Sequence, residues 1–288
     1  MAVAIGASES SLKRWTDQGL LTVTRTAGGH RRIPVTEAIR FVRDRRLTLV
    51  KPEVLGLPAS LGAVSALESD KGDAPDEVFY DLLRSGHDIG ARNHLIARFI
   101  AGESIASIAD GPLRSAMQSL GETWHQSPHG ILMEHRATEI CVEVLQELRN
   151  MVMPEKPLGR AIGGAIGGDP YKLPPLVATS VLNECGLQVV NLGADTPIQV
   201  LELACFGDDV DIQPDLAWLS VSVLENANRS TEALVRFGDR CHQNGIAVCI
   251  GGRAANALDL TSNDTIHVHH SMMDFATFAM ERFGSSDR

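Results

Sequence analysis

The feature that most constrains the fold is a series of five short apolar segments in the second half of the chain. They lie near residues 160–167, 187–193, 216–223, 246–252 and 265–270. Each is apolar throughout rather than at alternate positions, as expected for strands of a parallel sheet that is covered on both faces. Helical patterns separate the segments, so the sequence predicts five strand–helix units over residues 158–288.

Five such units in succession predict a doubly wound, flavodoxin-like (Rossmann-like) sheet, whose ligands bind beyond the carboxyl ends of the strands. The segments expected at that edge are 168–171, 193–196, 220–225, 251–252 and 269–270. The histidines among residues 267–270 suggest either a metal site or a cluster at the rim of a pocket, and no cysteine or acid is spaced to complete a metal site.

Residues 76–153 have a helical pattern and are expected to form a four-helix bundle. The last helix is the clearest, because apolar residues recur at steps of three and four from Ala137 to Val152. Residues 51–75 carry Pro, Gly, Ser and Asp with little periodicity, which predicts a linker.

Residues 1–50 predict a third, small domain. Ser8 and Ser10 can cap a helix that runs to about Asp17, with Leu12 and Trp15 spaced for burial. A hairpin with a tight turn at residues 27–29 follows, and Pro34 precedes a second helix over roughly 35–46. Helix, hairpin and helix in under fifty residues indicate a winged helix-turn-helix.

The charge is distributed unevenly between this small domain and the rest of the chain. Residues 1–51 carry ten Lys/Arg and four Asp/Glu, a formal charge of +6, whereas the whole chain carries −10. This contrast suggests that only the N-terminal domain meets a polyanion, although an ordinary solvated face remains an alternative.

Composition excludes other classes of protein. No apolar run approaches the roughly 20 residues that a membrane-spanning helix needs, and the N-terminus lacks the pattern of a signal peptide. Five cysteines without paired spacing are typical of reduced core residues, so a cytoplasmic protein is expected. No Ser/His/Asp or Cys/His order suggests a nucleophilic site, and we expect a protein that is not an enzyme.

The first fifty residues resemble the DNA-binding domain of the MerR family of transcription regulators. The resemblance rests on residues 8–15, Gly19-Leu20-Leu21 and residues 25–32. It implies that the helix ending near Asp17 is the recognition helix, which enters the major groove, and that the hairpin contacts phosphates. The residues implicated in DNA binding are Ser10, Ser11, Lys13, Arg14, Arg25, His30, Arg31 and Arg32. Met1 to Ile5 are expected to supply about half of the helix that precedes the recognition helix in that family. A basic protein-interaction module of the same fold is the alternative.

The helical bundle resembles the cap of light-responsive MerR-type repressors of carotenoid synthesis, which bind adenosylcobalamin. The pattern is Trp124-His125 followed by Glu134-His135. The resemblance implies that Trp124, Glu134 and His135 enclose the adenosyl group, and that His125 is a possible upper ligand of cobalt. From the residues alone, Glu134 continues an apolar stripe and needs a partner, either in a ligand or within the bundle.

The C-terminal domain resembles cobalamin-binding domains. The corresponding positions are Asp169 and Tyr171 after the first strand, Ser220 and Ser222 after the third, and Gly251-Gly252 after the fourth. Tyr171 stands where that family has the histidine ligand of cobalt, and Pro174 replaces a glycine. Three alternatives remain open: cobalamin without a lower ligand from the protein, another tetrapyrrole, or a degenerate pocket used only for protein contacts.

Together these patterns predict a DNA-binding transcription regulator gated by a cobalamin-type ligand, with light as a candidate signal. The alternatives are a corrinoid carrier for methyl transfer and a ligand-free interaction protein. No heptad pattern follows Arg46, so a homo-oligomer would have to form through the later domains.

Overall fold

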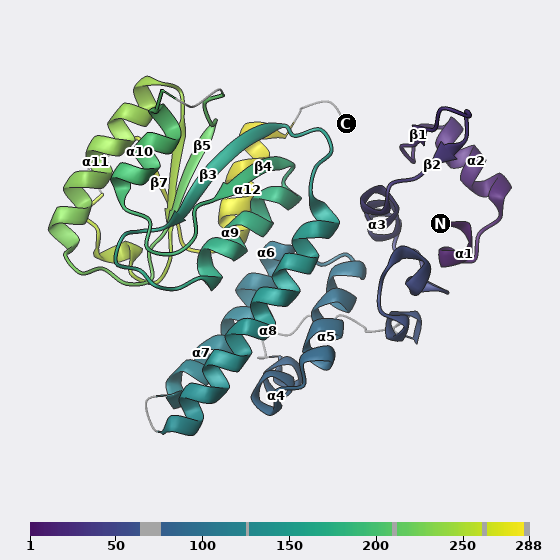
Figure 1. The fold of residues 1–288 in the computed structure, drawn as a ribbon, viewed down its shortest axis with the longest axis horizontal. Helices are drawn as coiled ribbons and strands as arrows, with labels where there is room; N and C mark the ends of the chain where they lie inside the picture. Colours follow the sequence, from purple (N-terminus) through teal and green to yellow (C-terminus); the bar gives the residue numbers. More distant parts are fainter. Residues whose placement is uncertain (64–75, 125–126, 209–211, 261–263, 285–288) are drawn as a thin grey trace. The chain divides into compact units, whose positions relative to one another are not determined.

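The computed structural model describes residues 1–63, 76–124, 127–208, 212–260 and 264–284. The chain divides into two compact units. The N-terminal unit contains residues 1–104 and 111–152, and the C-terminal unit contains residues 105–110 and 153–288. Figure 1 shows the helices and strands of both units.

The N-terminal unit begins with the predicted order of helix, hairpin and helix. Its elements are α1 (Ala2–Ile5), α2 (Glu9–Asp17), β1 (Thr24–Arg25), β2 (Arg31–Arg32) and α3 (Val35–Asp44). Ser8 caps α2 by accepting a hydrogen bond from the Ser11 amide, as predicted. Leu12 and Trp15, which were spaced for burial, are half-buried, and no residue of α2 is fully buried; the centre of the Trp15 ring lies 5.1 Å from that of Phe41. This order of elements is compatible with a winged helix-turn-helix, which stays a prediction.

The segment predicted as a linker is partly folded. Two short 3-10 helices, η1 (Pro52–Leu55) and η2 (Ala59–Ala63), occupy its first half, and Leu55, Leu57 and Leu61 are buried. These leucines are two and four residues apart, so neither the strand spacing nor the helical spacing is repeated. For this reason the sequence does not predict their burial. Residues 64–75 lie outside the described part of the chain.

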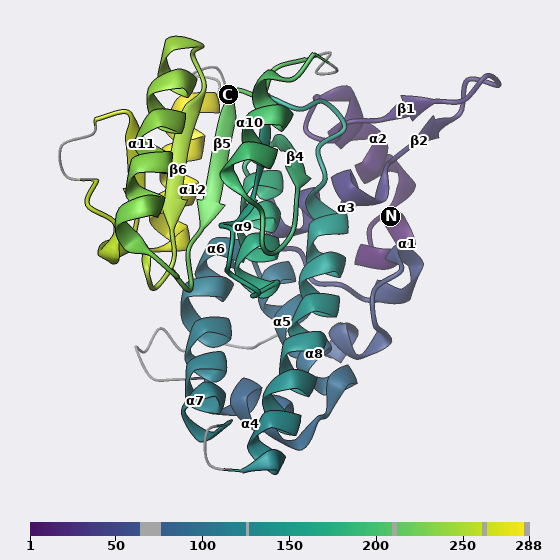
Figure 2. The same cartoon turned by 60° about the vertical axis from the view of Figure 1, so that its left-hand side comes forward.

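Four main helices follow in the same unit: α4 (Glu77–Ser85), α5 (Asp88–Ile100), α7 (Arg114–Trp124) and α8 (Pro128–Val152). α7 and α8 lie side by side (Figures 1 and 2). α8 buries six of the seven apolar residues that mark its predicted stripe: Ala137, Ile140, Cys141, Val144, Leu145 and Leu148. Asp76 caps α4, and its carboxylate also binds the side chains of His94 and Arg98.

The C-terminal unit contains the predicted five-stranded sheet. Its strands are β3 (Gly159–Ala165), β4 (Leu187–Asn191), β5 (Leu216–Ser220), β6 (Ala247–Gly251) and β7 (Ile266–His269). They are parallel and lie in the order β4-β3-β5-β6-β7. This order is that of a flavodoxin-like sheet, so the fold predicted for this domain is confirmed.

Helices cover both faces of this sheet. α10 (Ile198–Phe206) and α11 (Ala227–Gln243) lie on one face, over a core that includes Leu219, Val248 and Ile250. α9 (Leu173–Glu184) and α12 (Met272–Phe283) lie on the other face (Figure 1). α6 (Ile105–Ile108) packs against α9 and α12 and is followed by a π-helical turn, η3 (Ala109–Leu113). A 3-10 helix, η4 (Ala255–Ala257), follows β6.

The five cysteines are all free thiols, and four of them are buried. Burial raises the pKa of Cys141 to about 12, so this thiol stays protonated and unreactive at neutral pH. This agrees with the role of core residue expected from the sequence. None of the described helices combines the length and the apolar character needed to cross a membrane.

Candidate functional site

The residues that the C-terminal domain was expected to contribute to a ligand site gather at one edge of its sheet. β3, β5 and β6 run in parallel, so the loops that follow them emerge at the same edge. At or just beyond these strand ends lie Asp169, Tyr171, Ser220, Ser222, Gly251 and Gly252. Sheets of this topology bind their ligands at this carboxyl edge.

Asp169 ties two of these loops together. Its carboxylate is fully buried, accepts a hydrogen bond from the Tyr171 amide at 3.1 Å and accepts another from the Ser222 amide at 2.5 Å. Gly168, at φ +84°, supplies the left-handed turn that brings the carboxylate inward. Asp169 therefore fixes the backbone on which Tyr171 stands, and both of its oxygens already have a partner.

Tyr171 is partly exposed at this edge, with 38% of its surface accessible. The Arg253 guanidinium lies over its ring, 5.1 Å from the ring centre, and donates to the phenol oxygen at 3.3 Å. Arg253 also donates to the carbonyl oxygen of Ser222 at 2.9 Å. The position of the expected metal-binding histidine is thus held by a tyrosine that an arginine orients. Nothing local in the sequence indicates this role for Arg253, because its partners come from two distant loops.

One row of the sheet carries two buried polar atoms without a partner. Ala165, Ser220, Gly251 and His269 are neighbours across β3, β5, β6 and β7 and share the face covered by α12. Ser220 Oγ and His269 Nε2 have no hydrogen-bond partner among the described residues. Buried polar groups without partners are rare in folded proteins, and they are a reason to expect a ligand.

The sequence indicates a role for His269 only as a member of the histidine cluster at residues 267–270, not as a neighbour of Ser220. Burial lowers the pKa of His269, the Asp274 carboxylate opposes that shift, and the nearby His267 adds a smaller lowering effect. The imidazole is therefore neutral near pH 7 and offers one donor and one acceptor. The described residues contain no group of three or more side chains suited to hold a metal ion.

The paired glycines leave the backbone bare at the end of β6. Gly252 has φ +117°, and a Cβ there would lie 2.4 Å from the carbonyl oxygen of Val221. Gly251 leaves the position between Ser220 and His269 without a side chain. Pro174 opens α9 in its first turn, where a missing N–H removes no helical hydrogen bond.

The residues predicted in the helical cap belong to the N-terminal unit. Trp124 ends α7, and His125 lies outside the described residues. Glu134 accepts a hydrogen bond from the Thr138 hydroxyl at 3.2 Å and lies 3.6 Å from the exposed His135 imidazole. Glu134 thus finds partners on its own helix, in line with the alternative in which the bundle itself satisfies the carboxylate.

The residues predicted to bind DNA lie on α2 and on the hairpin. Seven of the eight are exposed, and Ser11 is half-buried. The Arg31 guanidinium, however, pairs with the Asp17 carboxylate at 2.7 Å and donates to the Thr16 hydroxyl. Arg31 therefore fastens the hairpin to α2, a structural role beside the predicted phosphate contact.

Comparisons with known proteins relate part of this chain to corrinoid proteins. Trimethylamine corrinoid protein 1 of Methanosarcina mazei is 30% identical over 115 residues, which cover 36% of this chain and 53% of that protein. Its namesake in Methanosarcina acetivorans is 31% identical over 104 residues, 34% of this chain and 48% of that protein. About a third of the chain is thus similar to corrinoid proteins. The chain spans about half the length of these relatives, and no protein-family model matches it.

A solved structure agrees in fold with this relationship. The monomethylamine corrinoid protein of Methanosarcina barkeri superposes with a TM-score of 0.52 at 20% identity, over 73% of this chain and all of that protein. At this level of identity the similarity concerns the fold alone. These similarities favour the corrinoid-protein alternative over the DNA-binding regulator, which none of them supports.

Proposed function

We propose that this chain binds a corrinoid at the carboxyl edge of its parallel sheet. The observation that carries the proposal is the buried Ser220 Oγ, which has no partner in the part of the chain that the structure describes. It lies beside the bare backbone of Gly251, in a chain of which about a third is similar to corrinoid proteins. A flat nucleotide tail needs close approach to backbone and a hydrogen-bonding group at its edge. Ser220 offers that group, and Gly251 leaves room for the ring.

The lower face of the corrin is the point at which this site differs from the pattern expected of cobalamin-binding domains. Tyr171 has no imidazole to offer cobalt, and Arg253 occupies its phenol oxygen. A phenol is a poor ligand at neutral pH compared with a neutral imidazole. We therefore infer that a bound cobalamin receives no lower ligand from the protein and keeps its own base on the metal.

The absence of a histidine ligand on this lower face also limits the functions that a bound corrinoid could have in this protein. A bound corrinoid supplies cobalt-centred group transfer, and a carrier for methyl transfer is the use that the similarities favour. The missing histidine argues against a carrier, because such proteins are expected to control cobalt through that ligand. We propose a protein that binds the corrinoid without acting as an enzyme.

A second candidate function is the DNA-binding regulator. The observation in its favour is the exposed basic set on α2 and the hairpin, in a segment of formal charge +6. Such a surface attracts the phosphate backbone of duplex DNA and steers the protein to it. In this candidate the corrinoid would be the signal, and light remains a proposed trigger.

The test is a titration of the full-length protein with hydroxocobalamin and adenosylcobalamin, monitored by absorbance in darkness and in light. The wild-type protein should bind with the spectrum of a cofactor whose own base stays on cobalt. The Tyr171→His variant should bind more tightly and shift the spectrum towards a histidine-ligated form.

The chain offers a matched control for this substitution. Tyr80, on α4, is the other tyrosine in the sequence, and Tyr80→His should leave the spectrum and the affinity as in the wild type. Absence of binding by all three proteins would refute corrinoid binding. Binding by the wild type with a histidine-type spectrum would refute only the inference about the lower face.

A further inference from the structure

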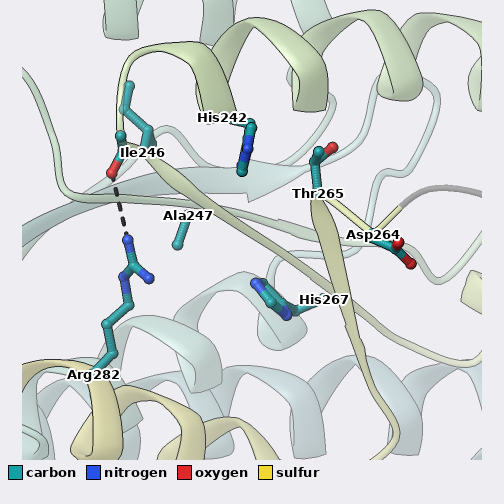
Figure 3. Close-up of a pocket in the computed structure, with 8 residues that line it drawn as sticks. His242, Ile246, Ala247, Asp264, Thr265, His267 and Arg282 are labelled. Atoms are coloured by element: carbon teal, nitrogen blue, oxygen red, sulfur yellow. Dashed lines mark hydrogen bonds between the residues drawn. The ribbon is translucent and has the colours of Figure 1, made fainter.

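A cavity of about 310 Å³ lies at the opposite end of the same sheet, near the amino ends of β6 and β7 (Figure 3). It is bounded by the last turns of α11 and α12 and by the starts of the two strands. The residues that line it are His242, Gly245, Ile246, Ala247, Asp264, Thr265, His267 and Arg282. None of them belongs to the candidate corrinoid site, which lies at the carboxyl edge.

Arg282 is the one permanent cation of this lining. It projects from the last turn of α12 into the cavity (Figure 3), and its guanidinium donates a hydrogen bond to the Gly245 carbonyl oxygen. That contact, 3.4 Å long, is the only hydrogen bond of Arg282 found within the described residues. A guanidinium carries five N–H donors, so most of its capacity remains for a ligand.

The two histidines add donors without adding a fixed charge. Burial, and after it the charge of Arg282, lowers the pKa of His267, so its imidazole is neutral near pH 7. His267 is held in place by the Phe278 ring, whose centre lies 4.5 Å from that of the imidazole. His242 comes from the end of α11 and faces the same cavity (Figure 3).

The size and balance of the cavity limit what it can hold. Its volume is at the lower end of the roughly 300–1,000 Å³ of ligand pockets, which suits a small molecule. Asp264 is the only acid of the lining, and with Arg282 it leaves the cavity close to neutral. One negative charge can be accepted there more readily than two. Ala247 offers an apolar surface to the rest of the ligand, whereas the Ile246 side chain lies in the core on the other face of the sheet.

We propose that this cavity binds a small monocarboxylate with an apolar body. The carboxylate pairs with the Arg282 guanidinium, because planar guanidinium and carboxylate groups match in a two-point hydrogen bond. His267 donates a further hydrogen bond, and the hydrocarbon part lies against Ala247.

The proposal is tested on the full-length protein by ligand-observed NMR with three probes: butyrate, butylammonium and inorganic phosphate. Butyrate should bind saturably, butylammonium should not, and phosphate should bind more weakly than butyrate. The Arg282→Gln variant should lose about tenfold or more in butyrate affinity, which is the loss of about 1.4 kcal/mol or more.

Arg236→Gln is the matched control, because Arg236 is an exposed arginine of α11 outside the lining. It should bind butyrate like the wild type. The His267 ring signals of the wild-type protein give a readout that needs no variant, and they should shift as butyrate is added. Equal binding of butylammonium, tighter binding of phosphate, an unchanged Arg282→Gln affinity or unmoved His267 signals would each overturn the proposal.

Discussion

Replacement of Asp169 should loosen the carboxyl edge of the sheet without unfolding the domain. Its buried carboxylate accepts hydrogen bonds from the backbone amides of Tyr171 and Ser222. A hydrogen bond to a charged group contributes about 1.5–3 kcal/mol. Asp169→Asn keeps the shape but turns one acceptor into a donor, so a local loss of about 2 kcal/mol is expected.

Hydrogen exchange followed by mass spectrometry measures this loss at the two amides. Exchange in the peptides that contain Tyr171 and Ser222 should become about thirtyfold faster, since each 1.4 kcal/mol is a factor of ten. Asp195→Asn is the control, because Asp195 accepts the Gly168 amide in the same region but is exposed to solvent. Equal exchange rates in Asp169→Asn and the wild type would refute the role assigned to this carboxylate.

Two further predictions concern the N-terminal unit. Burial alone would raise the pKa of Asp76, but hydrogen bonds from His94 and the Phe79 amide, with the charge of Arg98, lower it to about 2 from 3.8. The carboxylate should therefore add about 2 kcal/mol of stability above pH 4 that disappears as the pH falls towards 2, and Asp76→Asn should remove this dependence in urea denaturation. If the N-terminal domain binds DNA, Arg32→Ala should weaken binding to all sequences alike and reduce the salt slope of log K by about one, measured by fluorescence anisotropy.

The architecture of the C-terminal domain could be predicted from the sequence because both faces of its sheet are covered. That burial makes the central strands β5 and β6 apolar along almost their whole length, whereas the edge strands β4 and β7 also carry polar residues such as Gln188 and His267. The strands observed from Gly159 to His269 fall within or beside all five predicted segments. The cap of α2 at Ser8 and the buried stripe of α8 are local signals of the same kind.

The contacts that define the candidate site could not be predicted in this way. Arg253 finds Tyr171 across 82 positions of the chain, and Asp169 finds Ser222 across 53. Such pairs depend on how loops leave the sheet, which no local period encodes. The partner of Glu134, by contrast, is four residues away at Thr138, but helical spacing alone does not separate that contact from a ligand contact.

One aromatic ring contacts a histidine beside each of the two proposed sites of the C-terminal domain, and this predicts that the sites communicate. The centre of the Phe278 ring, on α12, lies 4.5 Å from the centre of the His267 ring, which lines the proposed carboxylate cavity. It lies 5.3 Å from the centre of the His269 ring, which is in the row beside the proposed corrinoid site. A ligand in one site that fixes the Phe278 ring reduces the conformational entropy that is lost when the second ligand binds in the other site. Butyrate affinity should therefore rise by roughly threefold when hydroxocobalamin is bound, and cobalamin affinity should rise by the same factor with butyrate, because binding linkage is reciprocal. Phe278→Leu should abolish the effect while both ligands still bind. Two affinities that are independent of one another in the wild-type protein would show that the ring transmits nothing.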